Sequence, residues 1–427
     1  MNAAIIFILL MVLMLTGMPI SISLGLTVLT FLFGFTNVPL ESVALKLFTG
    51  IEKFEIMAIP FFILAGNFLT HGGVARRMIN FASSMVGHWH GGLGLSGVLG
   101  CALFAAVSGS SPATVVAIGS ILLPAMTRAG FPKSFGAGVI TTSGALGILI
   151  PPSIVMVMYS VATNTSVGAL FMAGVIPGLA LAATLGGVTF YRARKFNYPR
   201  LPKASWAERW LTFKASAWGL LLIVIVMGGI YTGMFTPTEA AAMSAMYAFF
   251  VAVFVYKDMS LKDVPKVLLN SANMSAMLLY IITNAVLFSF IMTNENIPQA
   301  LADWMLGNGL GMITFLLAVN VILLLAGNFM EPSSIVLIFA PILFPVAMKL
   351  GIDPVHFGII MVVNMEVGMC HPPVGLNLYV ASGITKMGIT ELTVAVWPWL
   401  LSMLAFLMVV TYWPGLSTWF PRMLGMM

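Results

Sequence analysis

Long apolar runs, separated by short polar segments, cover most of this sequence. Only 7% of its residues are charged, whereas soluble globular proteins usually contain about 25%. A run of about 20 apolar residues crosses a bilayer as a helix, and 427 residues leave room for many such runs. The sequence therefore predicts an all-α polytopic membrane protein. We interpret the apolar residues 1–30 as membrane helices rather than as a cleaved signal.

Two pairs of adjacent prolines interrupt these apolar runs. Proline removes a backbone hydrogen bond, and no water is present in hydrocarbon to replace it. The first pair is Pro151–Pro152, and the second pair is Pro372–Pro373. Gly147 and Gly368 precede the two pairs at the same spacing, so one constant offset relates all of these positions. This agreement predicts an internal duplication.

Each copy also contains a pair of short apolar segments joined by a small polar turn. The turns are SGSSP, residues 108–112, and NFMEP, residues 328–332. Segments too short to cross the bilayer fit re-entrant hairpins, whose tips must face protein or a water-filled cavity. The predicted hairpins cover 92–127 and 309–349, and the predicted discontinuous helices cover 134–164 and 355–385.

Basic residues predict the topology. The dense basic run 192–214 contains one acid, so the positive-inside rule places it in the cytoplasm. Counting spans outward from this run gives the two copies opposite orientations. We therefore expect inverted repeats, an arrangement typical of secondary transporters. The predicted organisation is a first repeat over 1–165, a connecting helix and basic loop over 166–214, a second repeat over 215–390, and a C-terminal helix over 391–427.

Polar residues at the interruptions are the candidate binding residues. A half-helix N-terminus offers free N–H groups to a carboxylate, and a half-helix C-terminus offers carbonyl oxygens to a hard cation such as Na⁺. We therefore expect two quasi-equivalent cation sites around one cavity. The first draws on Ser108, Ser110, Ser111, Thr114, Thr142, Ser143, Gly144, Gly147 and Ser153. The second draws on Asn328, Glu331, Ser333, Ser334, Asn364, Glu366 and Gly368.

Several of these residues have alternative interpretations. Hydroxyl residues in membrane helices are often packing contacts. Glu331 and Glu366 are intramembrane carboxylates that could bind a cation, carry a proton or cap a helix end. Glu239, in the TPTE run 236–239, fits a structural capping box. Cys370 and His371 supply two metal ligands, which do not make a site.

The motifs of soluble enzymes and ATP-driven pumps do not occur: the sequence has no HExxH, no GxSxG and no GxxxxGK[ST]. We therefore predict that the protein is not an enzyme. Cys101 and Cys370 lie in apolar context and do not suggest a disulfide framework. The basic run has no second basic or aromatic patch beside it, so we expect no nucleic-acid partner. A channel remains an alternative, although it would not need coupled cation sites.

Three segments together resemble one family. SGSSPATVVAIGSILLPAM (108–126), GALGILIPPSIVMVMYS (144–160) and GIYTGMFTPTEAAA (229–242) are similar to the large membrane subunit of tripartite ATP-independent periplasmic (TRAP) transporters. The resemblance implies an elevator-type importer of the bacterial inner membrane, driven by a Na⁺ gradient, without an organic cofactor. It also implies two partners: a small four-helix membrane subunit on a separate chain and a periplasmic substrate-binding protein.

The resemblance extends the candidate sites. It adds Pro151 to the first Na⁺ site, and Gly327 and Pro372 to the second. It implies that substrate contacts Ser110, Ser111, Ser153, Ser333 and Pro373. The run 65–94 is most similar to the sialic acid branch, so we expect N-acetylneuraminate as the substrate. A C4-dicarboxylate or another carboxylate is the alternative.

Overall fold

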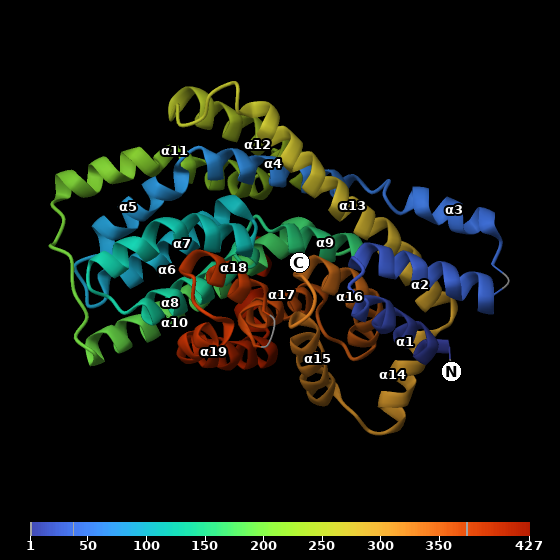
Figure 1. Cartoon of the computed structure of the whole chain (residues 1–427). Helices are drawn as coiled ribbons and strands as arrows, with labels where there is room; N and C mark the ends of the chain where they lie inside the picture. Colours follow the sequence, from blue (N-terminus) through green and yellow to red (C-terminus); the bar gives the residue numbers. More distant parts are fainter. Residues whose placement is uncertain (1, 37, 373–374) are drawn as a thin grey trace.

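The computed structural model describes residues 2–36, 38–372 and 375–427, and every regular element in these ranges is a helix (Figure 1). The first copy comprises α1 (Asn2–Leu15), α2 (Ile20–Phe35), α3 (Leu40–Thr49), η1 (Phe54–Met57), α4 (Ala58–His71), α5 (Val74–Val86), α6 (Gly92–Ser108), α7 (Ser111–Arg128), α8 (Lys133–Gly144), η2 (Ala145–Ile148) and α9 (Ile154–Thr163). The second comprises α11 (Trp206–Tyr231), α12 (Pro237–Phe250), η3 (Val251–Val255), α13 (Val264–Asn294), α14 (Ile297–Gly307), α15 (Met312–Gly327), α16 (Pro332–Lys349), α17 (Pro354–Cys370) and α18 (Leu376–Thr385). The remaining helices are α10 (Val167–Lys195), α19 (Ile389–Tyr412) and α20 (Gly415–Met423). Seven helices of the described ranges are long and apolar enough to cross a membrane, which confirms the predicted class.

The two hairpins and the two discontinuous helices occur in both copies. α6 ends at Ser108 and α7 begins at Ser111, while α15 ends at Gly327 and α16 begins at Pro332. After α8 the chain forms the short η2 and resumes a helix only at α9. After α17 it resumes a helix at α18. The sequence pattern of paired breaks therefore corresponds to paired interruptions in the fold.

Equivalent helices of the two copies pack against each other. In sequence, α2 of the first copy corresponds to α12 of the second, and α4 corresponds to the later part of α13. α4 packs on α12, and α2 packs on α13, so the two contacts match each other. In the same way α7 packs on α18 and α16 packs on α9. Figure 1 shows α4 and α12 along one edge of the molecule, with α13 running on from them toward α2. Each copy therefore buries part of its apolar surface against the other copy.

The repeat extends past the boundaries predicted at residues 165 and 390. Pro177 lies inside α10 and Pro398 lies inside α19, at the same offset as the paired prolines. The two helices pack together, and the indole Nε1 of the fully buried Trp399 donates to Thr189 Oγ1 at 2.9 Å. Helices α10 and α19 are therefore a further matched pair.

The copies differ where a surface helix is expected in each. Amphipathic character over 40–50 and over 261–270 predicts one short helix per copy. The first is present as α3, but the second prediction is wrong, because α13 runs unbroken from Val264 to Asn294. Gly50 ends α3, whereas α13 has no glycine and its one proline lies in its first turn.

The predicted capping box at α12 is confirmed. Thr236 Oγ1 accepts the Glu239 N–H at 3.2 Å, and Glu239 Oε2 accepts the Thr236 N–H at 2.8 Å. Two otherwise free donors at the helix start are thereby satisfied.

Replacing Thr236 by alanine removes half of this box. We expect Thr236→Ala to lower the free energy of unfolding by about 1 kcal/mol, the usual effect of losing an N-cap hydroxyl. The measurement is thermal unfolding in detergent. Thr232→Ala is the control, since Thr232 Oγ1 donates only to the Gly228 and Gly229 carbonyl oxygens in the last turn of α11. An equal shift for both variants would contradict the prediction.

Candidate functional site

The tip of the first hairpin is a compact cluster of hydroxyl and carbonyl oxygens. Gly109 has φ of +60°, a conformation that favours glycine, and turns the chain between α6 and α7. Ser108 Oγ and Thr114 Oγ1 lie 2.8 Å apart, and each contacts the Ser110 carbonyl oxygen, at 3.3 and 2.8 Å. The predicted cluster of Ser108, Ser110 and Thr114 is therefore brought together.

This tip lies directly on the interruption after α8. A Cβ atom at Gly147 would lie 2.6 Å from the Ser110 carbonyl oxygen and 2.8 Å from Ser111 Cα. A Cβ atom at Gly109 would lie 3.0 Å from the Pro152 carbonyl oxygen. The close backbone approach explains why glycine occupies Gly147, and it places hairpin and interruption side by side as predicted.

A residue of the second copy completes this region. The Ser111 hydroxyl donates to Asn377 Oδ1 at 3.1 Å and accepts from Asn377 Nδ2 at 2.8 Å. Asn377 Nδ2 also lies 3.4 Å from the Thr141 carbonyl oxygen. Sequence reasoning missed Asn377, because the matching position in the first copy is Met156. Its only signal is a fully buried amide in an apolar helix.

The tip of the second hairpin has a different chemistry. Glu331 caps α16: its carboxylate accepts the Ser333 N–H at 3.1 Å, and the Ser334 N–H and Oγ at 2.8 Å each. Of the three roles left open for Glu331, helix capping is the one with visible contacts. Asn328 Oδ1 lies 3.1 Å from His371 Nδ1.

The second tip also lies on the interruption of its own copy. A Cβ atom at Gly327 would lie 2.9 Å from Gly368 Cα, which mirrors the contact of the first tip with Gly147. Asn364 and Glu366 do not join that tip through hydrogen bonds. Asn364 Nδ2 donates to the Asn320 carbonyl oxygen at 3.0 Å and to Asn320 Oδ1 at 2.9 Å, midway along α15.

Asn320 is a second residue that sequence reasoning missed. Asn320 accepts from Asn364, and its own Nδ2 donates to Thr411 Oγ1 at 2.9 Å, so it connects α17 with α19. Glu366 lies near the interruption of the first copy, close to the N–H of Leu149. That N–H donates to the Leu146 carbonyl oxygen at 3.2 Å, so the carboxylate gains no hydrogen bond from it.

Four oxygen atoms on α8 and α17 are buried and have no hydrogen-bond partner among the described residues. They are Ser143 Oγ, Asn364 Oδ1, and both carboxylate oxygens of Glu366. Ser143 and Asn364 are related by the same offset as the paired prolines and therefore occupy equivalent positions in the two copies. An unsatisfied buried polar group costs about 1–3 kcal/mol, so it calls for a functional explanation. The donor set, entirely oxygen, fits a hard cation.

The other predicted residues lie near the interruptions but have their own local contacts. Thr142 Oγ1 donates to the Gly138 carbonyl oxygen at 2.8 Å. Ser153 caps α9 and donates to the Ile148 carbonyl oxygen at 2.6 Å. Gly144 packs against Val115 of α7, Pro151 lines an apolar cavity of about 530 Å³, and Pro372 is partly exposed. The predicted substrate contact at Pro373 lies outside the described residues.

A conventional metal centre is not part of this site. No group of three His, Cys, Asp or Glu side chains converges anywhere in the described ranges. The Cys370 thiol instead donates to the Thr141 carbonyl oxygen at 3.4 Å, and His371 contacts Asn328. Both cysteines are free and buried.

The fold and the two hairpin tips define a secondary transporter of the inverted-repeat class. The family model described as "Tripartite ATP-independent periplasmic transporter, DctM component" matches residues 7–416, and the chain belongs to this family. It is thus a transporter permease subunit rather than an enzyme, a multi-pass protein of the bacterial inner membrane. Membership also implies a small membrane subunit and a periplasmic binding protein as partners.

Individual relatives cover nearly the whole chain. The C4-dicarboxylate TRAP transporter large permease protein of Rhodobacter capsulatus is 76% identical over 100% of both chains, and that of Pseudomonas aeruginosa is 55% identical over 95% of both. The sialic acid TRAP transporter large permease protein of Vibrio cholerae is 36% identical over 96% of both. The crystal structure of the YdaH transporter of Alcanivorax borkumensis shares the fold, with a TM-score of 0.61 at 16% identity, covering 88% of this chain and 89% of that one.

Breaking the contact between Ser111 and Asn377 tests the link between the copies. We expect Asn377→Val to reduce uptake in reconstituted vesicles at least tenfold and to lower the free energy of unfolding by about 1–3 kcal/mol. Adding Ser111→Ala should cause little further loss, because both variants remove the same contact. Ser120→Ala, at an exposed position of α7, is the control. If the loss in the double variant equalled the sum of the two single losses, a direct contact between Ser111 and Asn377 would be contradicted.

Proposed function

We propose that this chain is the large membrane subunit of a Na⁺-coupled importer of a C4-dicarboxylate. The strongest support for the substrate is the comparison of relatives. Identity is 76% to a protein named for C4-dicarboxylates and 36% to one named for sialic acid. The similarity of residues 65–94 to the sialic acid branch, which suggested N-acetylneuraminate, is therefore outweighed along the rest of the chain. The alternative substrate becomes the main proposal.

The unpaired oxygens support cation coupling. Ser143 Oγ and Asn364 Oδ1 are buried at equivalent positions of the two copies, and neither has a hydrogen-bond partner. Two equivalent positions with free oxygen atoms fit two quasi-equivalent Na⁺ sites. Glu366 adds two further buried oxygens beside the first interruption. This pairing is the single observation that carries the proposed coupling.

The helix ends support a carboxylate site at the first hairpin. No side chain among the described residues caps the N-terminus of α7 or of α18, and the Ser111–Asn377 contact brings these two ends together. Helix N-termini favour negative charge. The equivalent end of α16 is already occupied by the Glu331 carboxylate. A substrate carboxylate is therefore expected at α7 and α18.

The hairpins and the interrupted helices would move as one body against α2, α4, α12 and the later part of α13. The two groups are in close contact at Gly66 of α4, where a Cβ atom would lie 3.1 Å from the Ser108 carbonyl oxygen. Because glycine has no side chain, the hairpins could slide past α4 at this position. The small membrane subunit is expected as a separate chain that supports the stationary helices, and the periplasmic binding protein is expected to deliver the substrate.

Uptake measurements distinguish the substrates. We expect proteoliposomes that contain this chain, the small membrane subunit and the binding protein to accumulate succinate when Na⁺ is higher outside. N-acetylneuraminate uptake should be at least tenfold lower. Uptake that favours N-acetylneuraminate over succinate would support sialic acid as the substrate instead. Flux that does not saturate and does not depend on Na⁺ would support a channel.

A second measurement addresses the cation sites. Ser143→Ala should raise the Na⁺ concentration for half-maximal uptake about tenfold, equivalent to about 1.4 kcal/mol of binding free energy. Thermal stability should not fall, because the Ser143 hydroxyl makes no hydrogen bond with the protein. The matched control is Ser96→Ala, which removes a buried hydroxyl that donates to the Gly92 carbonyl oxygen at 2.7 Å. An unchanged Na⁺ dependence in Ser143→Ala would remove this residue from the cation site.

A further inference from the structure

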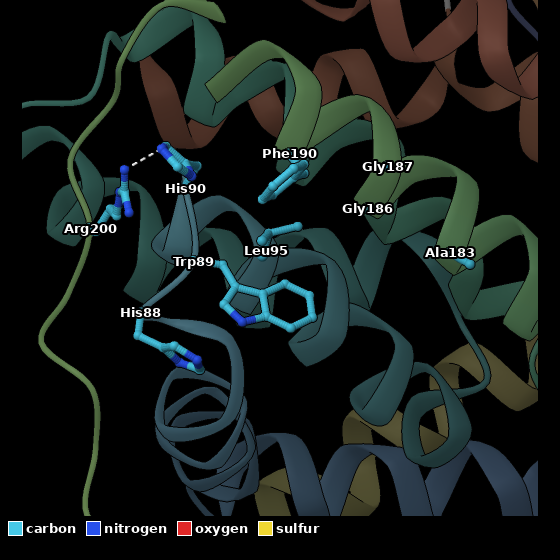
Figure 2. A pocket seen from close by; sticks show the side chains of 9 residues that line it. All are labelled: His88, Trp89, His90, Leu95, Ala183, Gly186, Gly187, Phe190 and Arg200. Carbon is cyan, nitrogen blue, oxygen red and sulfur yellow. Dashed lines mark hydrogen bonds between the residues drawn. The ribbon is translucent and has the colours of Figure 1, made fainter. Parts of the chain in front are cut away.

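A cavity of about 650 Å³ lies far from the hairpin tips, at the end of α10 that carries the basic run. The loop between α5 and α6 lines one side with His88, Trp89 and His90. Arg200 approaches from the segment between α10 and α11, and Figure 2 shows it pointing toward His90. Phe190 of α10 completes the rim. The positive-inside rule places this end in the cytoplasmic leaflet.

The polar part of the rim is cationic. The Arg200 guanidinium donates to His90 Nε2, which requires a neutral imidazole. Desolvation, followed by the nearby guanidinium groups of Arg200 and Arg194, lowers the pKa of His90 and keeps it neutral. None of the four ion pairs formed by the described residues includes Arg194 or Arg200. The charge of Arg200 therefore has no carboxylate partner in the described part of the chain. His88 Nδ1 is also buried there without a hydrogen-bond partner.

The rest of this cavity is apolar. Gly186 and Gly187 leave the surface of α10 bare, and a Cβ atom at Gly187 would meet no heavy atom within 4 Å. Leu95 of α6 faces them. Trp89 is 51% exposed, and its ring meets the ring of Phe190 edge-on at 6.4 Å. A half-exposed tryptophan at this level is typical of the membrane interface.

The apolar surface continues along the same two helices. The cavity of about 530 Å³ that reaches Pro151 is lined by Leu99 of α6 and Leu179 of α10. Leu99 follows Leu95 by one helical turn, and Leu179 precedes Ala183, which lines the first cavity, by one turn. The lining residues of the two cavities therefore follow one another along α6 and α10, and we refer to this stretch as the groove.

We propose that this groove binds one anionic membrane phospholipid, with the phosphate diester at Arg200 and an acyl chain between α6 and α10. Basic pockets between membrane helices on the cytoplasmic side are suited to anionic head groups. From Phe190 to Met172 the groove follows α10 for about 27 Å at the rise of an α-helix. One leaflet is about 15 Å thick, so the groove accommodates a whole chain.

The position of the lipid has a consequence for movement. Ile223 and Met227 of α11 line the deep part of the groove opposite α6, the first helix of the first hairpin. Beside the direct contact of α6 with α11, an acyl chain there would line part of the boundary between the two helices with a fluid apolar surface. A soluble phosphate compound would need the cationic rim but would make no use of this apolar length.

Lipid binding to the purified full-length chain tests the head-group contact. Native mass spectrometry would follow titration with phosphatidylglycerol and, separately, with zwitterionic phosphatidylethanolamine. We expect one tightly bound phosphatidylglycerol, at least tenfold weaker binding of phosphatidylethanolamine, and at least tenfold weaker phosphatidylglycerol binding in Arg200→Gln. The control is Lys203→Gln, an exposed residue of the same segment that does not line the cavity. Equal phosphatidylglycerol affinity in Arg200→Gln and wild type would overturn the proposal.

A second variant tests the acyl chain independently of the charge. Gly187→Leu fills the open surface of α10 and should also weaken phosphatidylglycerol binding at least tenfold. Gly34→Leu is the control, because Gly34 also faces open space but lies in α2. Millimolar inorganic phosphate should fail to displace the lipid. Displacement by phosphate would identify a soluble anion site, and displacement by the small membrane subunit would identify a protein interface; either result would overturn the proposal.

Discussion

The packing of each hairpin against a half-helix of the other copy is the constraint on which the rest of this structure depends. α7 lies on α18, and α16 lies on α9, so each copy buries part of its interrupted helix against the other copy. An interruption in a membrane helix frees backbone groups that hydrocarbon cannot satisfy. Here the freed segments meet other backbone segments at glycine contacts such as Gly147 with Ser110 and Gly327 with Gly368. The paired prolines are therefore compatible with the membrane because the hairpin tip of the same copy covers each interruption and the other copy packs on the half-helices.

The duplication is unequal at its two tips. Glu331 caps α16, whereas its equivalent in the first copy, Ser110, makes no cap hydrogen bond at α7. Asn377 reaches Ser111 across the copies, whereas its equivalent, Met156, has no hydrogen-bond donor to offer. The Glu331 carboxylate thus neutralises the partial positive charge at the N-terminus of α16. The N-terminus of α7, at the first tip, retains its partial positive charge. Such a difference allows one carboxylate site and two cation sites to occur in a symmetric scaffold.

Sequence reasoning predicted the features that depend on neighbours along the chain. The constant offset between the copies located both interruptions, and the spacing of Ser108, Ser110 and Thr114 located a cluster that one turn holds together. It missed Asn377 and Asn320, whose partners lie 266 and 91 residues away. Glu366, which is predicted at the second hairpin, also lies near Leu149 at the interruption of the first copy, a contact that the repeat does not indicate. Symmetry within one chain does not reveal contacts that join unlike positions of the two copies.

The unpaired oxygens suggest how cation binding and movement would be coupled. Ser143 Oγ and Asn364 Oδ1 each cost about 1–3 kcal/mol when buried without a partner among the described residues, and the Glu366 carboxylate costs more when it is charged. Binding of Na⁺ at these atoms would remove that cost only while α8 and α17 remain covered by the hairpins, because opening a hairpin lets water satisfy the same oxygens. A ligand shifts an equilibrium by its difference in affinity for the two states. The cation would therefore favour the closed hairpins, which is the state in which a transport domain can cross an apolar membrane without exposing polar groups.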